Sequence, residues 1–281
     1  MSDYPYVLSS YIFWRKHSDS LDKTYGISFP CPAELWASLG KICPICDGAN
    51  SFYSDDDVRY YCVCQLTRML DNTRFQFESP IQPMRFADLK PFTHDGDVSA
   101  DLAKAYAQGA IDLINIKKHL VQWLKAPNRW MFIEGGYGNG KTHIMSVIKY
   151  TLPKLALYIS AEQLQRKFFA SLRETEGLEP VIEMLSQAPI LLIDDFGSEH
   201  LNDFTLSTLH KITNFRHMAS PQNFPVVMTT NHSISAMATT PNAALGRTIS
   251  RMIDSSYSDI FHLAQPDYRH DGTKAHMKVV K

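Results

Sequence analysis

The sequence predicts an α/β domain with a parallel sheet covered by helices, preceded by a small N-terminal domain. Two observations indicate the α/β class. Apolar, strand-like segments alternate with segments of helical spacing in the second part of the chain, and a glycine-rich phosphate-loop signature stands between one such strand and the next helix. A third observation indicates a separate N-terminal domain: four of the five cysteines lie between Cys43 and Cys64, upstream of that signature.

The elements of the α/β domain follow from their patterns. Ser99 can cap the first helix, whose apolar residues recur at helical spacing: Leu102, Tyr106, Ala110, Leu113 and Ile114. Further helices are expected over residues 142–150, 161–172 and 202–218, the last with these residues facing inward: Leu206, Leu209, Ile212 and Phe215. The expected strands cover residues 130–133, 155–159, 190–193, 224–228 and 260–263.

The composition suits a folded protein of one ordinary domain and one smaller one. The chain has 281 residues, 44% apolar and 20% charged, with a net charge of −1. This balance argues against a disordered tail or a strongly basic nucleic-acid binder, so any DNA contact must come from a local basic patch or from several subunits together. No apolar run is long enough for a membrane helix, and residues 1–16 lack the order of a signal peptide. We therefore expect a cytoplasmic protein without a membrane partner.

The boundary between the two domains is expected near residue 80. Residues 79–83 form a turn-rich stretch marked by two prolines, which is typical of a domain junction. The predicted domains are thus an N-terminal partner-interaction domain over residues 1–80 and an α/β domain over residues 81–281.

A complete phosphate-loop signature opens the second expected helix. The pattern GxxxxGK[ST] is matched by Gly135-Gly136-Tyr137-Gly138-Asn139-Gly140-Lys141-Thr142. Glycines let the backbone wrap a phosphate with its N–H groups, and the N-terminus of the helix adds a favourable dipole. Lys141 would neutralise the β- and γ-phosphates of ATP, and the Thr142 hydroxyl would bind Mg²⁺.

Two further strands end in polar residues that suit the same site. Asp194 and Asp195 follow the apolar run 190–193, and Asn231 follows the strand 224–228. Because open α/β sheets bind ligands at the carboxyl ends of their strands, these side chains are expected near the phosphate loop. Asp194 would hold magnesium, directly or through water, and Asp195 would polarise the attacking water. Asn231 would bond to the γ-phosphate or the water.

Two basic segments are candidates for contacts with other molecules. Arg247 and Arg251 lie four residues apart and share one helical face, so either could reach the ATP of a neighbouring subunit. Arg166 and Lys167 precede Phe168-Phe169, a combination that suits contact with a nucleic-acid backbone and its bases, although both phenylalanines could instead belong to the core.

The cysteine cluster predicts a structural zinc site in the N-terminal domain. Its proposed ligands form a CxxC pair and a CxC pair: Cys43, Cys46, Cys62 and Cys64. Four thiolates suit tetrahedral Zn²⁺ and leave no open position for catalysis. The aromatic pair before Cys62 resembles the strand of a small zinc ribbon. Reduced core cysteines or a redox pair are the alternatives, and Cys31 and His17 are possible substitute ligands.

These pieces, in this order, resemble the DnaC/DnaI/IstB group of AAA+ ATPases over residues 84–270. The resemblance rests on Tyr137-Gly138-Asn139-Gly140-Lys141-Thr142-His143, Leu191-Leu192-Ile193-Asp194-Asp195-Phe196-Gly197-Ser198-Glu199, Thr229-Thr230-Asn231, and Arg247 with Ser250-Arg251-Met252. The ending Asp267-Tyr268-Arg269 also looks like that group.

The resemblance implies roles for individual residues. His143 would belong to the nucleotide site, Asn231 would be sensor I, and Arg251 the arginine finger, with Arg247 as the second choice. Arg269 would be a residual sensor. Since about 30 residues follow Arg251, a reduced or absent lid is expected, as in this group.

The resemblance also implies a function, a Mg²⁺-dependent ATPase that assembles into a homo-oligomer on DNA when it binds ATP. Members of the group either load a DnaB-type replicative helicase or, like IstB and TnsC, regulate a transposase. The N-terminal domain would choose the partner, and a zinc-bearing N-terminal domain resembles some DnaI-like loaders in layout. A third possibility is an adaptor that binds ATP as a switch with little turnover.

Overall fold

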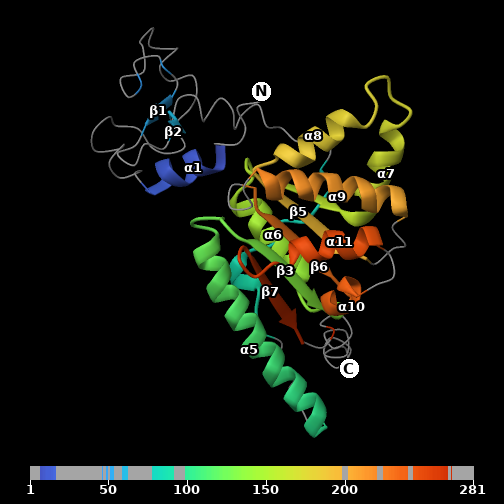
Figure 1. The fold of residues 1–281 in the computed structure, drawn as a ribbon. Coiled ribbons are helices and arrows are strands. Elements are labelled where there is room, and N and C mark those ends of the chain that lie inside the picture. The colour runs from blue at the N-terminus through green and yellow to red at the C-terminus, as the bar shows by residue number, and fades with distance from the viewer. Residues whose placement is uncertain are drawn as a thin grey trace. The chain divides into compact units, whose positions relative to one another are not determined.

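The computed structural model describes residues 7–16, 46, 49, 51–53, 59–62, 78–91, 99–197, 202–219, 224–239, 243–264 and 267. The chain divides into two compact units, Met1–Gln76 and Phe77–Lys281 (Figure 1). Of the helices among the described residues, none is long and apolar enough to cross a membrane.

The described part of the N-terminal unit is a helix packed on a hairpin. Helix α1 (Val7–Lys16) contacts β2 (Arg59–Tyr61), which pairs with β1 (Ser51–Tyr53) in antiparallel fashion. The Trp14 indole donates a hydrogen bond to the carbonyl of Tyr61 at 2.7 Å, and the Tyr61 amide donates to the Ser10 hydroxyl at 2.8 Å. The strand expected before Cys62 is thereby confirmed.

The second unit contains a parallel sheet of five strands, as the sequence predicts. The strands are β3 (Trp130–Gly135), β4 (Ala156–Ser160), β5 (Ile190–Phe196), β6 (Val226–Thr230) and β7 (Ser258–Leu263). They lie in the order β4-β5-β6-β3-β7, and each neighbouring pair is parallel. Strand β3 therefore lies inside the sheet, between β6 and β7, and its carboxyl end opens into the phosphate loop.

Helices pack on the sheet and on one another (Figure 1). They are η2 (Phe86–Asp88, a 3-10 turn), α5 (Ala100–Trp123), α6 (Lys141–Thr151), α7 (Ala161–Ser171), α8 (Glu179–Gln187), α9 (Asp203–Met218), α10 (Ile234–Ala238) and α11 (Ala243–Met252). Helix α6 contacts four strands, α7 contacts β4 and β5, and α9 lies against both α8 and α11. Helix α5 runs beside β7, and Figure 1 shows its N-terminal half extending past the sheet.

Details of three helices differ from the sequence prediction. Ser99 caps α5 as expected, since its hydroxyl accepts a hydrogen bond from the amide of Leu102. The side chains of Leu102 and Ile114 are nevertheless exposed. In α9 the inward position predicted for Phe215 is wrong, because this ring is 42% exposed and the neighbouring Arg216 is fully buried instead. Helix α8 was absent from the sequence prediction.

Buried Arg216 joins the end of α8 to the start of β6. Its guanidinium donates to the carbonyls of Leu185, Ser186 and Ala188 at 2.8–3.2 Å. It also donates to the carbonyls of Phe224 and Pro225, at 3.2 and 2.9 Å. Burial lowers the pKa of Arg216 to about 9, so the group is still charged at pH 7. A cation at the C-terminal end of α8 meets carbonyl groups that have no partner within the helix.

The proline-marked stretch forms a strap on the second unit. We use the word strap for residues 78–85, which contact β4 and α6. The Ser79 amide donates to the carbonyl of Tyr158 at 3.0 Å, and its hydroxyl accepts from the amide of Ser160 at 2.9 Å. The sequence placed the domain boundary near residue 80, whereas the units divide after Gln76.

Candidate functional site

The phosphate loop has the open conformation that its glycines permit. Gly138 and Gly140 have φ values of 69° and 95°, in the left-handed region that side chains disfavour. A Cβ atom at Gly138 would also lie 1.7 Å from a carboxyl oxygen of Asp267. A larger residue at Gly138 would therefore collide with Asp267, whereas Tyr137 at the tip of the loop is 64% exposed.

Lys141 lies at the centre of this loop. Its side chain is 5% exposed. The ammonium donates to the carbonyls of Gly135 and Gly136 at 2.9 and 2.6 Å, and to the amide oxygen of Asn139 at 3.1 Å. Asn139 in turn donates to the carbonyl of Leu263 at 2.8 Å, so the end of β7 supports the loop. The phosphate loop thus holds a buried ammonium group at its centre.

The two aspartates at the end of β5 differ in burial and in backbone conformation. Asp194 is 2% exposed, and Asp195 is exposed. Asp195 has a φ of 55°, the only positive φ of a non-glycine residue among those described. Such a conformation costs about 1–2 kcal/mol and is tolerated best by Asn and Asp. The irregular backbone turns the Asp195 carboxylate toward the same space as Asn231, whose amide nitrogen lies 3.5 Å from it.

Two buried hydroxyl groups hold Asp194. The Tyr158 hydroxyl on β4 donates to one carboxyl oxygen at 2.8 Å, and the Thr229 hydroxyl on β6 donates to the other. Burial, and then the charge on Asp194, raise the pKa of Tyr158, so its hydroxyl stays a donor. The sequence assigned no role to Tyr158, and it singled out Thr229 only as part of the segment Thr229-Thr230-Asn231. Both lie near the carboxyl ends of strands that flank β5, but only the sheet register shows that they meet its carboxylate.

A cavity of about 490 Å³ brings most of the predicted residues together. Its lining consists of Met84, Tyr137, Gly138, Asn139, Gly140, Lys141, Thr142, His143, Asp195 and Asn231. The loop, the exposed aspartate and Asn231 therefore face one space, as the sequence predicts. Asp194 is buried and is not part of this lining.

The strap and the 3-10 turn after it complete the rim of this cavity. The Met84 amide donates to the Ser146 hydroxyl at 2.9 Å, and a ring nitrogen of His143 lies 2.9 Å from the Arg85 carbonyl. Leu89 packs beside Gly140, at 3.5 Å from the place of a Cβ atom. Lys117 of α5 donates to the Leu89 carbonyl at 2.6 Å. Apolar side chains thus border one side of the phosphate loop.

The two candidate finger residues on α11 do not line the cavity of their own chain. Arg251 donates to the side-chain oxygen of Asn214 on α9, and Arg247 is exposed. Both arginines lie close enough to His210 to act on its pKa, which is lowered by burial and then by Arg251 and Arg247. The salt bridges of the described residues include none with either arginine.

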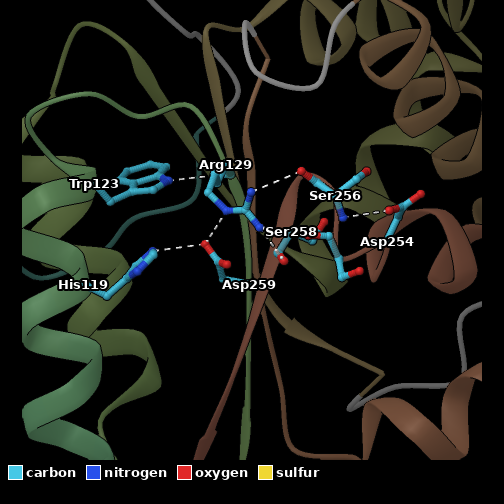
Figure 2. A network of polar contacts seen from close by, with 8 residues as sticks. His119, Trp123, Arg129, Asp254, Ser256, Ser258 and Asp259 are labelled. Carbon is cyan, nitrogen blue, oxygen red and sulfur yellow. Dashed lines mark hydrogen bonds and ion pairs between the residues drawn. The ribbon is translucent and has the colours of Figure 1, made fainter.

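A polar network holds the connection from α11 to β7 in place (Figure 2). Arg129 donates to Asp259 at 2.8 Å and to the carbonyls of Ser255, Ser256 and Ser258 at 3.0–3.2 Å. The Trp123 indole donates to the Arg129 carbonyl at 2.7 Å. Tyr257 lies between the serines that this network contacts, and its hydroxyl donates to the carbonyl of Arg251.

The candidate DNA patch on α7 is only partly as expected. Phe168 is fully buried and belongs to the core, whereas Phe169 is 42% exposed and packs against Phe204. Arg166 forms an ion pair with Glu162, one helical turn earlier. The base-stacking role is therefore left to Phe169 alone.

Two of the four proposed zinc ligands belong to the described residues. Cys46 and Cys62 are both buried. The carbonyl of Cys46 accepts a turn hydrogen bond from the amide of Ala49, and Cys62 directly follows β2. Cys43 and Cys64 lie outside the described residues, as do Cys31, His17 and Arg269. No group of three metal-binding side chains occurs within the described ranges.

The fold and the cavity are those of a P-loop α/β domain, in which the phosphate loop, an acidic residue and a polar strand tip surround one space. Within this class, residues 114–242 match the family model described as the bacterial DnaA ATPase domain.

Curated relatives match over a short stretch. The chain is 40% identical to the chromosomal replication initiator protein DnaA of Cereibacter sphaeroides over 70 residues, which is 23% of this chain and 15% of the relative. It is 34% identical to DnaA of Crocosphaera subtropica over 93 residues, or 29% of this chain and 20% of the relative. The chain thus spans at most a fifth of these two relatives.

Solved structures are similar at a coarser level. A crystal structure of DnaI matches with a TM-score of 0.46 and 16% identity, over 66% of this chain and 89% of that one. The DnaC helicase loader matches with a TM-score of 0.44 and 15% identity, over 63% and 98%. Domain III of DnaA from Thermotoga maritima matches with 0.45 and 21%, over 71% and 75%.

Proposed function

We propose that this protein is an ATP-hydrolysing AAA+ protein of replication initiation, which helps to load a DnaB-type hexameric helicase onto DNA. The observation that carries the ATPase is the single cavity shared by Lys141, Asp195 and Asn231. The match of residues 114–242 to a DnaA ATPase domain favours replication over transposition.

The residues of the cavity fit a magnesium nucleotide. Thr142 and Asp194 offer a hydroxyl and a carboxylate, the oxygen ligands that Mg²⁺ prefers. When bound, the ion would neutralise charge on the phosphate oxygens. Loop amides and Lys141 would bind the β- and γ-phosphates, and Met84 and Leu89 would border the base. Asp195 would take the proton of the attacking water, with Asn231 orienting that water.

The arginines of α11 would act on the ATP of a neighbouring subunit. Two features support this role: Arg251 and Arg247 do not line their own cavity, and no acidic side chain among the described residues pairs with them. Arg251, which Asn214 and Tyr257 hold, is the preferred finger. Hydrolysis would then require ATP-driven assembly of a homo-oligomer.

The ATPase is tested with two substitutions and a control. Lys141→Ala should abolish nucleotide binding, and Asp195→Asn should bind nucleotide but release phosphate orders of magnitude more slowly. Lys104→Ala, on the exposed side of α5, should behave as wild type. Normal turnover by the Asp195→Asn protein would remove this residue from the mechanism.

The partner is tested by pull-down of the full chain with a DnaB-type helicase and, in parallel, with a transposase, each with and without ATP. The proposal predicts ATP-dependent capture of the helicase. Capture of the transposase alone would instead assign the protein to the IstB/TnsC-like regulators. Binding of ATP without measurable turnover in the presence of helicase and DNA would make it an adaptor.

We also propose a structural zinc ion in the N-terminal unit, held by Cys43, Cys46, Cys62 and Cys64. Support comes from the CxxC and CxC spacing and from the burial of both described cysteines, Cys46 and Cys62. Elemental analysis should give one zinc per chain, and a zinc-free protein that is folded and active would contradict the proposal. Cys62→Ser should destabilise the N-terminal unit, because structural zinc supplies folding free energy locally.

A further inference from the structure

Strand β5 contains a bulge at the acidic pair. Ile193 pairs with Met228 and Phe196 pairs with Thr230, so two residues of β5 stand opposite the single residue Thr229 of β6. Those two residues are Asp194 and Asp195. A bulge leaves its extra residue without the ladder hydrogen bond that regular pairing would provide.

The Thr229 hydroxyl takes the place of that missing partner. Its oxygen accepts a hydrogen bond from the Asp195 amide at 3.0 Å, and its proton goes to the carboxylate of Asp194. One hydroxyl thereby contacts both aspartates. Since Thr229 is fully buried, water cannot replace the hydroxyl when it is removed.

The same contact stabilises an unusual backbone. Asp195 has a φ of 55°, and its amide is directed to Thr229 while its carboxylate lines the cavity. If the amide lost its partner, the bulge could return to regular pairing. Because successive residues of a strand point to opposite faces, a shift of one residue would turn the Asp195 carboxylate away from the cavity.

We propose that Thr229 is a positioning residue for hydrolysis: its hydroxyl keeps the bulge that directs the Asp195 carboxylate into the cavity. The inference rests on the proposed ATPase function, in which Asp195 acts on water. Thr229 itself does not line the cavity, and it acts through Asp195.

Two substitutions separate the hydroxyl from the shape of the side chain. Thr229→Val keeps the shape and removes the hydroxyl, and Thr229→Ser keeps the hydroxyl. Thr213→Val is the matched control, because Thr213 is also fully buried, but its hydroxyl contacts the Leu209 carbonyl within α9. The measurements are kcat and KM for ATP, binding of a non-hydrolysable fluorescent ATP analogue, and hydrogen exchange of the Asp195 amide.

The proposal predicts a split between binding and turnover. Thr229→Val should bind the analogue within about twofold of wild type, but lose about ten- to a hundredfold in kcat, since a base misplaced by about 1 Å costs up to 10²-fold. Its Asp195 amide should exchange faster. Thr229→Ser should recover most of the rate, and Thr213→Val should keep it.

Three results would overturn the proposal: wild-type kcat in Thr229→Val, equal loss in the Val and Ser variants, or an Asp195 amide whose exchange is unchanged. If the wild-type protein hydrolyses no ATP under assembly conditions, the proposed ATPase function fails. The exchange measurement still decides in that case whether the hydroxyl holds the bulge.

Discussion

Replacing Arg216 with methionine should destabilise the second unit strongly without altering the nucleotide site. Methionine fills a similar volume but offers no donor, so five carbonyls lose a hydrogen bond from the guanidinium: those of Leu185, Ser186, Ala188, Phe224 and Pro225. The Pro225 carbonyl keeps a second donor, the Leu191 amide at 3.1 Å. The fully buried guanidinium is remote from the cavity lining, and the effect should therefore appear in stability alone.

The magnitude follows from two opposing contributions. Hydrogen bonds to a charged group contribute roughly 1.5–3 kcal/mol each, so five of them give about 7–15 kcal/mol. Against this stands the cost of burying an ion, which is several kcal/mol after relaxation. We expect a net loss of about 3–5 kcal/mol, a large share of the ~5–15 kcal/mol that stabilises a typical domain.

Thermal and urea unfolding of the full chain measure this loss. For a domain near 200 residues, 3–5 kcal/mol corresponds to a decrease in Tm of roughly 6–20 °C. Arg173→Met is the matched control, because this exposed arginine follows α7 and should change stability by less than about 0.5 kcal/mol. An Arg216→Met protein as stable as the control would refute the view that these carbonyls need the guanidinium.

Three further predictions concern charge. Arg251→Ala should bind ATP normally but hydrolyse it poorly, and mixing it with Lys141→Ala should restore part of the activity if the finger acts across subunits; a co-assembled mixture no more active than its parts would point to Arg247 or to a role within one subunit. DNA binding should be weak in the monomer, increase with ATP-driven assembly, and fall in the Arg166→Ala/Lys167→Ala protein; equal binding by mutant and wild type at several salt concentrations would exclude this patch. The pKa of His210 is lowered from its ordinary value of 6.5 by burial and by the arginines of α11, so folding favours the neutral ring and stability should fall as the pH drops through 6.5. His210→Gln should therefore show a shallower loss of stability between pH 7 and pH 5, and an unchanged slope would contradict this assignment.

The parts of the fold that local patterns encode could be predicted. All five strands and the phosphate loop follow from apolar runs and glycine spacing, and the structure confirms them. Helix α9 shows a case in which a local pattern gives the wrong prediction. The apolar positions Leu206, Leu209 and Ile212 predict that Phe215 is buried next. Arg216 is buried instead, because its guanidinium donates hydrogen bonds to five carbonyls. Those carbonyls belong to the end of α8 and to the residues before β6, and the sequence pattern of α9 alone cannot predict contacts with them.

The candidate site could be predicted as far as local motifs report it, and the contacts between distant elements could not. Lys141, Asp195 and Asn231 carry motif signals at the ends of strands, and they line one cavity. Tyr158 carries no such signal, and the segment Thr229-Thr230-Asn231 gives no role to Thr229, since the contacts of both residues depend on the register of β4 and β6 against β5. Helix α8 did offer a local sign, a proline in its first turn.

The strap makes the tether of the N-terminal unit part of the nucleotide pocket's rim. Its contacts run in series from Glu78, paired with Lys149, to Arg85, which meets His143 at the loop. The strap therefore runs antiparallel to α6. If the strap detached from its N-terminal end, these contacts would break one after another. Met84 would leave the cavity only near the end of that sequence.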